Sequence, residues 1–185
     1  MLNRLELRDG LPEHLQVLRA QYPRDMWTGH AHFNGLTAFW LERHGMFRQV
    51  MTRLVRDTQA MLDARAPRYG AEMPRLTGFL LDQLHGHHGI EDDHYFPMFR
   101  GLDARLLDGF DLLDADHHAL DDQMAQLAEQ SNLVLREIQA GDVARIDVAD
   151  LLAVQQAFQR YLIRHLEDEE DLIVPLILEY GADMV

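Results

Sequence analysis

The amino-acid sequence predicts an all-α protein, an up-down-up-down four-helix bundle with a short N-terminal helix and loop extension. Apolar residues recur at steps of three and four, which is helical spacing. Glycine and proline divide the chain into four long segments. The 185 residues, 47% of them hydrophobic, suffice for one core and leave little room for a second large domain. We therefore expect residues 1–33 to form the extension and residues 34–185 to form one four-helix bundle.

The extension is expected to contain a short helix near residues 12–21 and a loop packed outside the bundle. The first long helix is predicted over about residues 34–65, before a break with glycine and prolines at residues 66–74. The second, from about residue 76 to residue 91, is less regular because it contains two glycines. The apolar positions of the first helix are Leu36, Phe39, Trp40, Phe47, Val50, Met51, Leu54, Met61 and Leu62.

The last two helices are the clearest in the sequence. After a break at residues 101–109, a heptad stripe runs from Phe110 to Ile138. The fourth helix is expected to begin near Asp147, which can cap it, and apolar residues then follow at alternating steps of four and three to Leu176. Four helices of roughly 25 to 33 residues, joined by short breaks, favour antiparallel packing.

Composition excludes several classes of function. The net charge of −14 disfavours nucleic-acid binding and anionic membranes, because both depend on basic side chains. No stretch of about 18 apolar residues is present, and residues 1–12 lack the apolar core of a signal peptide. The absence of cysteine excludes disulfides, thiolate zinc sites and cysteine nucleophiles. We expect a cytoplasmic protein without nucleic-acid or membrane partners, and the sequence leaves any protein partner unknown.

Polar residues at otherwise apolar helix positions are the informative feature. Burying a carboxylate costs several kcal/mol unless a cation or a hydrogen-bonded partner compensates. Two of the histidines precede a glutamate by four residues, so each pair lies on one helix face. Two buried glutamates beside four buried histidines therefore predict a metal site. The predicted ligands are His44, His87, Glu91, His117, His165 and Glu169.

Their positions along the helices support a shared site. His44 and His117 fall early in the first and third helices, whereas the two His-Glu pairs fall late in the second and fourth. In an antiparallel bundle these places meet at one end. Residues 87–98 also match residues 165–176 at a constant offset, with histidine, glutamate, aspartate and proline coinciding. Two equivalent half-sites favour two metals over one.

The pattern of a lone histidine, a His-x-x-x-Glu, a second lone histidine and a second His-x-x-x-Glu resembles the hemerythrin-like family, the HHE cation-binding domain. The resemblance covers about residues 36–180. It implies a non-heme centre of two iron ions, oxo- or hydroxo-bridged, in which Glu91 and Glu169 bridge the metals and the four histidines are terminal ligands. Zinc or manganese can occupy the same ligands.

The chain departs from the oxygen-carrying hemerythrins at two positions. Their fifth histidine, one turn after the lone histidine of the third helix, is replaced by Asp121, and their fourth-helix aspartate is replaced by Glu169. Both metals then keep an open position unless Asp121 completes one of them. The pattern is more similar to hemerythrin-like proteins with peroxide or nitric-oxide chemistry and to iron-centre repair proteins, although the cysteine-bearing segment of the latter is absent.

Three functions follow from the resemblance. The favoured one is binding or sensing of dioxygen, nitric oxide or peroxide. The alternatives are an enzyme that disproportionates peroxide or reduces nitric oxide, and an iron-storage or regulatory binding module. The sequence does not decide whether the protein is an enzyme.

Several neighbouring residues leave alternatives open. His88 and His118 adjoin predicted ligands, but helical direction favours His87 and the heptad favours His117. Glu91 and His94 also form the Glu-x-x-His of ferritin-like bundles, although the repeat counterpart of His94 is a leucine.

Other residues near the predicted site are expected to be structural. Tyr95 and Tyr161 lie one turn from predicted ligands, where core packing is favoured over a role as hydrogen-bond or radical partner. Apart from Glu169, the acidic stretches 92–93 and 167–171 are expected to be solvated. The remaining histidines are interpreted as solvated or loop residues, with a position near the metal left open for His30 and His32: His14, His30, His32 and His85.

Overall fold

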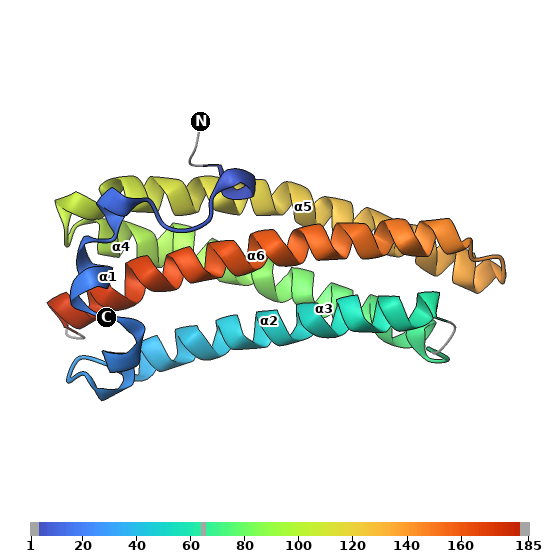
Figure 1. Cartoon of the computed structure of the whole chain (residues 1–185), viewed down its shortest axis with the longest axis horizontal. Coiled ribbons are helices and arrows are strands. Elements are labelled where there is room, and N and C mark those ends of the chain that lie inside the picture. The colour runs from blue at the N-terminus through green and yellow to red at the C-terminus, as the bar shows by residue number, and fades with distance from the viewer. Residues whose placement is uncertain (1–3, 64–65, 182–185) are drawn as a thin grey trace. The chain divides into compact units, whose positions relative to one another are not determined.

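The computed structural model describes residues 4–63 and 66–181, and within them the chain is helical and contains no β-strand. This confirms the predicted all-α class. The predicted end of the first long helix at residue 65, and the two ends of the sequence, lie outside the described residues. The α-helices (Figure 1) are α1 (Val17–Gln21), α2 (Gly35–Leu62), α3 (Tyr69–Ile90), α4 (Phe96–Arg100), α5 (Leu107–Ala140) and α6 (Arg145–Tyr180).

Helix α3 differs from its prediction at both ends. It begins at Tyr69 and therefore includes Pro74, which the sequence assigned to the break. A proline this close to a helix start costs one backbone hydrogen bond, and the helix continues past it. At the other end the chain forms a π-helical turn, η4 (Glu91–Tyr95), before α4. Turns of this type are rare and frequently lie at functional sites.

The start of α5 and the start of α6 were also predicted slightly too late. Helix α5 begins before Gly109, and a side chain at that position would come within 2.8 Å of Leu172. The glycine therefore allows close approach of α5 and α6. Helix α6 begins two residues before Asp147, which lies in its first turn, where a negative charge is favourable.

The chain divides into two compact units, each built from segments of four helical stretches. The first unit contains Met1–Gly45, His88–His118 and Ile163–Val185, and the second contains Met46–His87 and Ala119–Leu162. Each long helix or helical stretch passes from one unit into the other.

The N-terminal segment packs on the helices of the first unit, and its leucines are buried there. Leu11, Leu15 and Leu18 are buried in one cluster with Phe110 of α5 and Leu172 of α6. Figure 1 shows this segment beside α5 and α6. Its leucines cover surface that those helices would otherwise expose to water. The expected short helix is present as η2 (Glu13–Leu15) followed by α1.

The second unit has a core of aliphatic and aromatic side chains. Phe47, Met51 and Leu54 of α2 are buried, as the helical spacing predicted. In the first unit, the prediction that Phe39 belongs to the core was wrong, because this residue is 58% exposed. No helix in the described part of the chain has the length and apolar character needed to cross a membrane.

Candidate metal centre

The described residues contain two groups of side chains that could hold a metal ion. One group is His88, His117 and His165, all buried, each with one ring nitrogen within 4.8 Å of the others. The other brings His44 to Glu91 and Glu169 within the same limit. His87 is also a member of this second group. It lies on α3 one helical turn before Glu91, so the two side chains share a helix face.

The predicted ligands lie at the positions along the helices that a shared site at one end of the bundle requires. His44 lies on α2 and His117 on α5, both in the first part of the helix. Glu91 opens the π-helical turn after α3, and His165 and Glu169 lie one turn apart near the end of α6. All five are buried within the first unit. His87 is the last residue of its segment in the second unit, and its ring lies 5.1 Å from that of Phe47.

Nε2 of three of these histidines, His44, His117 and His165, faces a glutamate oxygen at a distance that suits a shared cation. The Nε2 atoms of His44 and His165 are each 3.5 Å from Oε2 of Glu169, and Nε2 of His117 is 3.5 Å from Oε2 of Glu91. These distances are too long for good hydrogen bonds. Two ligand atoms each about 2.1 Å from one ion, at an angle of about 110°, lie about 3.4 Å apart.

The other ring nitrogen of two of these histidines contacts a carboxylate. His44 Nδ1 lies 3.0 Å from Oε1 of Glu170, and His117 Nδ1 lies 2.8 Å from Oδ1 of Asp92. An Nδ1–H group that donates to such an oxygen leaves the Nε2 lone pair free to bind a metal. Metal-binding histidines in proteins are commonly held by carboxylates in this way.

The third histidine, His165, has a looser partner of the same kind. Its Nδ1 is 3.5 Å from Oδ2 of Asp116, a buried carboxylate on α5. The sequence had indicated solvated acids around the site, and this was wrong for the α6 stretch, because Asp168, Glu170 and Asp171 are buried. The N-terminal segment covers the face of α6 that the sequence left open to solvent.

Several polar atoms of the centre are buried without a hydrogen-bond partner within the described residues. They include Nε2 of His117, both ring nitrogens of His165 and Oε2 of Glu169. Each such atom costs about 1–3 kcal/mol if it stays unsatisfied. Nitrogen lone pairs and carboxylate oxygens that converge on one place are satisfied together by a cation. The residues present therefore fit a bound metal.

Burial shifts the pKa of two of these groups in the metal-free chain. Burial raises the pKa of Glu91 well above its usual range, and the negative charge of Glu169 raises it further. Burial lowers the pKa of His165 well below its usual range, and nearby His117, His44 and Arg8 lower it further. A neutral imidazole is the form that coordinates metals, because its lone pair is not occupied by a proton.

Sequence reasoning missed the role of Trp40, which it interpreted as core packing. Trp40 is buried, and its Nε1–H donates a hydrogen bond to Oε1 of Glu169. Its ring packs edge-on against Tyr95 at 5.0 Å, and Tyr95 stacks on Phe99 at 6.0 Å. The expected packing role of Tyr95 is confirmed by these contacts. Trp40 precedes His44 by one helical turn, and this spacing could have indicated that its side chain lies near the predicted ligands.

The structure also places His88, which helical direction had disfavoured, beside two predicted ligands. The ring of His88 stacks on that of His117 with centroids 4.1 Å apart and lies 5.5 Å from that of His165. Consecutive helical residues point about 100° apart, so His87 and His88 face different groups. The sequence shows that His87 and His88 are adjacent. It does not show which helices each of the two rings contacts.

Other candidates lie away from the centre. Asp121 is exposed, so it does not occupy the place of the missing fifth histidine. His118 is exposed, in agreement with the preference for His117. His94 is exposed as well, which removes the ferritin-like interpretation of Glu91 and His94.

Buried histidines and glutamates converging from separate helices define an all-α protein with a metal-binding core. The family model of the hemerythrin HHE cation-binding domain matches residues 35–177. This match covers most of the chain, and the protein belongs to the hemerythrin family. It confirms the resemblance drawn from the motif spacing. No curated protein and no solved structure matches the chain.

Proposed function

We propose that this protein holds two iron ions at a carboxylate-bridged centre and binds or senses dioxygen, nitric oxide or peroxide there. The observation that carries the proposal is the convergence of the histidine and glutamate ligand atoms in a buried site. When bound, iron supplies electrons that can be shared reversibly with a small ligand. The protein supplies imidazole nitrogens and two carboxylates in a buried site, with further carboxylates behind the histidine rings.

The positions of the glutamates support two metals. Glu169 lies 3.5 Å from His44 in one group and 3.5 Å from His165 in the other. Glu91 belongs to the group of His44 and lies 3.5 Å from His117 of the other group. A carboxylate that faces histidines of both groups is in the position of a bridging ligand. Bridging by Glu91 and Glu169 is therefore the arrangement that the contacts favour.

The histidines divide unequally between the two groups. We propose that His88, His117 and His165 hold one metal and that His44 and His87 hold the other. His88 then supplies the third ring that Asp121 cannot supply. With this assignment we no longer expect an open coordination position on both metals. The open position lies on the metal that His44 and His87 bind.

The donor set and its surroundings suit iron and a small ligand. Imidazole and carboxylate bind first-row metals such as iron, and zinc and manganese are the competing metals. Phe96 stacks near His117 with ring centroids 5.4 Å apart, and Trp40 lies against Glu169. Aromatic neighbours of the ligands suit a small neutral molecule better than a large polar substrate. The cytoplasmic location and the absence of nucleic-acid and membrane partners remain predictions.

Anaerobic loading with ferrous iron tests this proposal. We expect two irons per chain by metal analysis, and absorption bands that appear with dioxygen or nitric oxide and disappear when the gas is removed. Rapid oxygen release from peroxide would instead support the enzyme. Iron-dependent stability without either response would support the storage or regulatory module. Two tightly bound irons in a chain carrying both Glu91→Gln and Glu169→Gln would refute the bridged centre.

A further inference from the structure

The N-terminal segment contacts the carboxylates that hold the ligand histidines. Arg24 is the clearest case: its Nη1 donates to Oε2 of Glu170 at 2.6 Å, and its Nε donates to Oδ1 of Asp171 at 2.8 Å. The other oxygen of Glu170 lies 3.0 Å from Nδ1 of His44. A continuous chain of contacts therefore runs from Arg24 through Glu170 to a predicted ligand.

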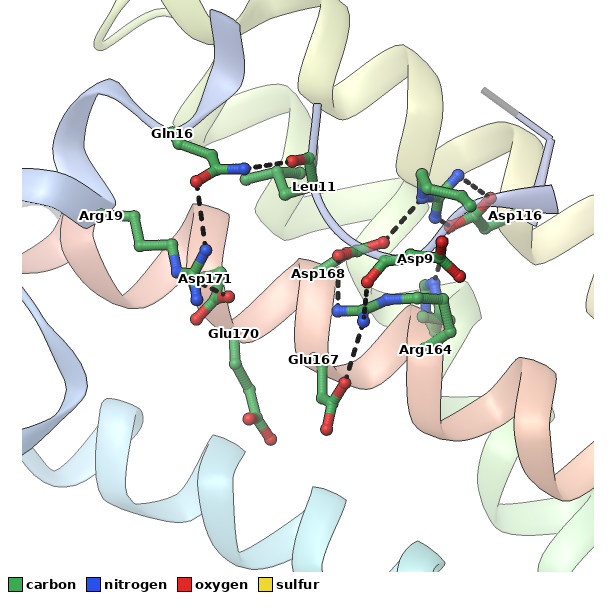
Figure 2. Close-up of polar contacts among 12 residues, drawn as sticks. Asp9, Leu11, Gln16, Arg19, Asp116, Arg164, Glu167, Asp168, Glu170 and Asp171 are labelled. Carbon is green, nitrogen blue, oxygen red and sulfur yellow. Dashed lines mark hydrogen bonds and ion pairs between the residues drawn. The ribbon is translucent and has the colours of Figure 1, made fainter. Parts of the chain in front are cut away.

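A second arginine makes an equivalent chain. The buried Arg8 donates to both oxygens of Asp116, and its Nε donates to Oδ2 of Asp168 at 2.7 Å. Asp116 faces Nδ1 of His165. Figure 2 shows the carboxylates Asp116, Asp168, Glu170 and Asp171 along this face. Arg8 and Arg24 thus reach different histidines from the same segment.

The charges of α6 explain why these arginines are needed. Asp168, Glu169, Glu170 and Asp171 are consecutive and all buried. Four adjacent helical positions point in directions that together span most of a turn, so the metal can neutralise only the side that faces it. Buried carboxylates on the remaining sides need their own cations. The N-terminal segment supplies them from Arg8, Arg24 and Arg19, which lies 2.9 Å from Asp171.

Arg24 is itself held in place before any metal binds. Its guanidinium lies 4.9 Å from the ring centre of Trp27, and that ring is buried against Val174 and Leu178 of α6. Trp27 Nε1 donates to the backbone oxygen of Tyr22 at 2.8 Å. An arginine that lies over a buried ring and pairs with two carboxylates fixes the orientation of those carboxylates.

We propose that residues 4–29 act as a clamp on the metal centre, in which Arg24 through Glu170, and Arg8 through Asp116, are positioning residues for His44 and His165. This proposal rests on the proposed function. The clamp holds each carboxylate in place beside Nδ1 of its ring, with Glu170 at 3.0 Å from His44 Nδ1 and Asp116 at 3.5 Å from His165 Nδ1. Nε2 of each ring then stays directed at the metal. The segment outside the four long helices is then part of the centre.

The test is a double-mutant cycle on iron affinity. Ferrous iron is titrated anaerobically into the metal-free full-length protein in competition with a chelator of known affinity. Arg24→Gln should weaken the binding of one iron roughly 10- to 100-fold, which is the usual effect of losing a residue behind a ligand. Glu170→Gln should have a similar effect. If Arg24 acts through Glu170, the double variant should be no weaker than Glu170→Gln alone.

Arg105→Gln is the matched control. Arg105 is 54% exposed at its side chain and pairs with the buried Asp103, whereas Arg24 is 42% exposed and pairs with the buried Glu170. Asp103 contacts Arg105 and Tyr180, and neither is a predicted ligand. The control should lose comparable stability in the metal-free protein while binding iron as the wild type does. Arg24→Lys, which keeps the charge, should recover part of the iron affinity.

Three results separate the explanations. Wild-type iron affinity in Arg24→Gln, or additive losses in the double variant, would overturn the clamp while leaving the metal centre intact. A wild-type chain that binds no iron would instead refute the proposed function. If Arg24→Gln fails to fold, the cycle is carried by Arg24→Lys and Glu170→Gln, and equal iron affinity in both variants and the wild type would overturn the clamp.

Discussion

Replacing Glu91 by glutamine should change the metal-free and the iron-loaded protein in opposite directions. The Glu91 carboxylate is fully buried, and its pKa in the metal-free chain is raised by burial and by Glu169. Because the pKa is raised in the folded state, the protonated Glu91 side chain does not disfavour folding at a pH below the ordinary carboxyl pKa. As the pH rises toward the raised pKa, the wild-type protein loses stability relative to a variant that stays neutral. Glutamine is neutral throughout. The metal-free Glu91→Gln variant should therefore melt above the wild type at pH 8, and by less at pH 4.5.

In the loaded protein the same change removes an anionic ligand. Free iron at 100 times its Kd stabilises a folded protein by about 2.7 kcal/mol, and iron at one Kd by about 0.4 kcal/mol. A 100-fold loss of affinity thus removes about 2.3 kcal/mol. The unfolding entropy of a chain of 185 residues is about 0.4 kcal/mol per degree. The Tm increase produced by iron should therefore shrink by about 6 °C.

The assay is thermal unfolding followed by circular dichroism, with ferrous iron under anaerobic conditions and with excess chelator. Glu42→Gln is the control, since it makes the same chemical change at an exposed position of α2. It should leave the iron-dependent increase in Tm unchanged. An iron-dependent increase in Glu91→Gln equal to that of the wild type would refute the reasoning, as would a lower Tm for the metal-free variant at pH 8.

Three other predictions test separate parts of the structure. His88→Ala should reduce bound iron from two equivalents toward one while His118→Ala leaves it unchanged, and metal analysis showing two irons in both would contradict the ligand role of His88. Trp40→Phe should destabilise the loaded protein to urea by about 2–4 kcal/mol, because it loses a hydrogen bond to a charged group and leaves a cavity; a loss below 1 kcal/mol would count against that bond. Arg105 lowers the pKa of Asp103 to about 2, so Asp103→Asn should cost about 1 kcal/mol at pH 7 after allowance for solvent screening. This cost should disappear as the pH falls from 4 to 2, and a cost independent of pH in urea unfolding would exclude the ion pair as its cause.

The helices and most of the centre could be predicted from the sequence because both depend on local spacing. An apolar stripe with a period near 3.6 identifies a helix without knowledge of its partners. A histidine four residues before a glutamate puts both on one face, whatever that face meets. The positions of His44 and His117 early in their helices, and of Glu91 and Glu169 late in theirs, then required only antiparallel packing.

The tertiary structure decided which side chains surround those ligands. Whether His87 or His88 faces His117 depends on the rotation of α3 against its neighbours, and the π-helical turn at Glu91 changes the direction of the side chains that follow it. Neither effect leaves a pattern in the local sequence.

The environment of the acidic residues was likewise decided by contacts far apart in the chain. Glu170 resembles an exposed acid in the sequence, and it is buried because Arg24, 146 residues away, covers it. Hydrophobic spacing records which face of a helix is apolar, but it does not record which distant segment supplies a counter-charge to a polar face. The sequence alone determined the helices and the ligand types, and the packing of the N-terminal segment determined how those ligands are held.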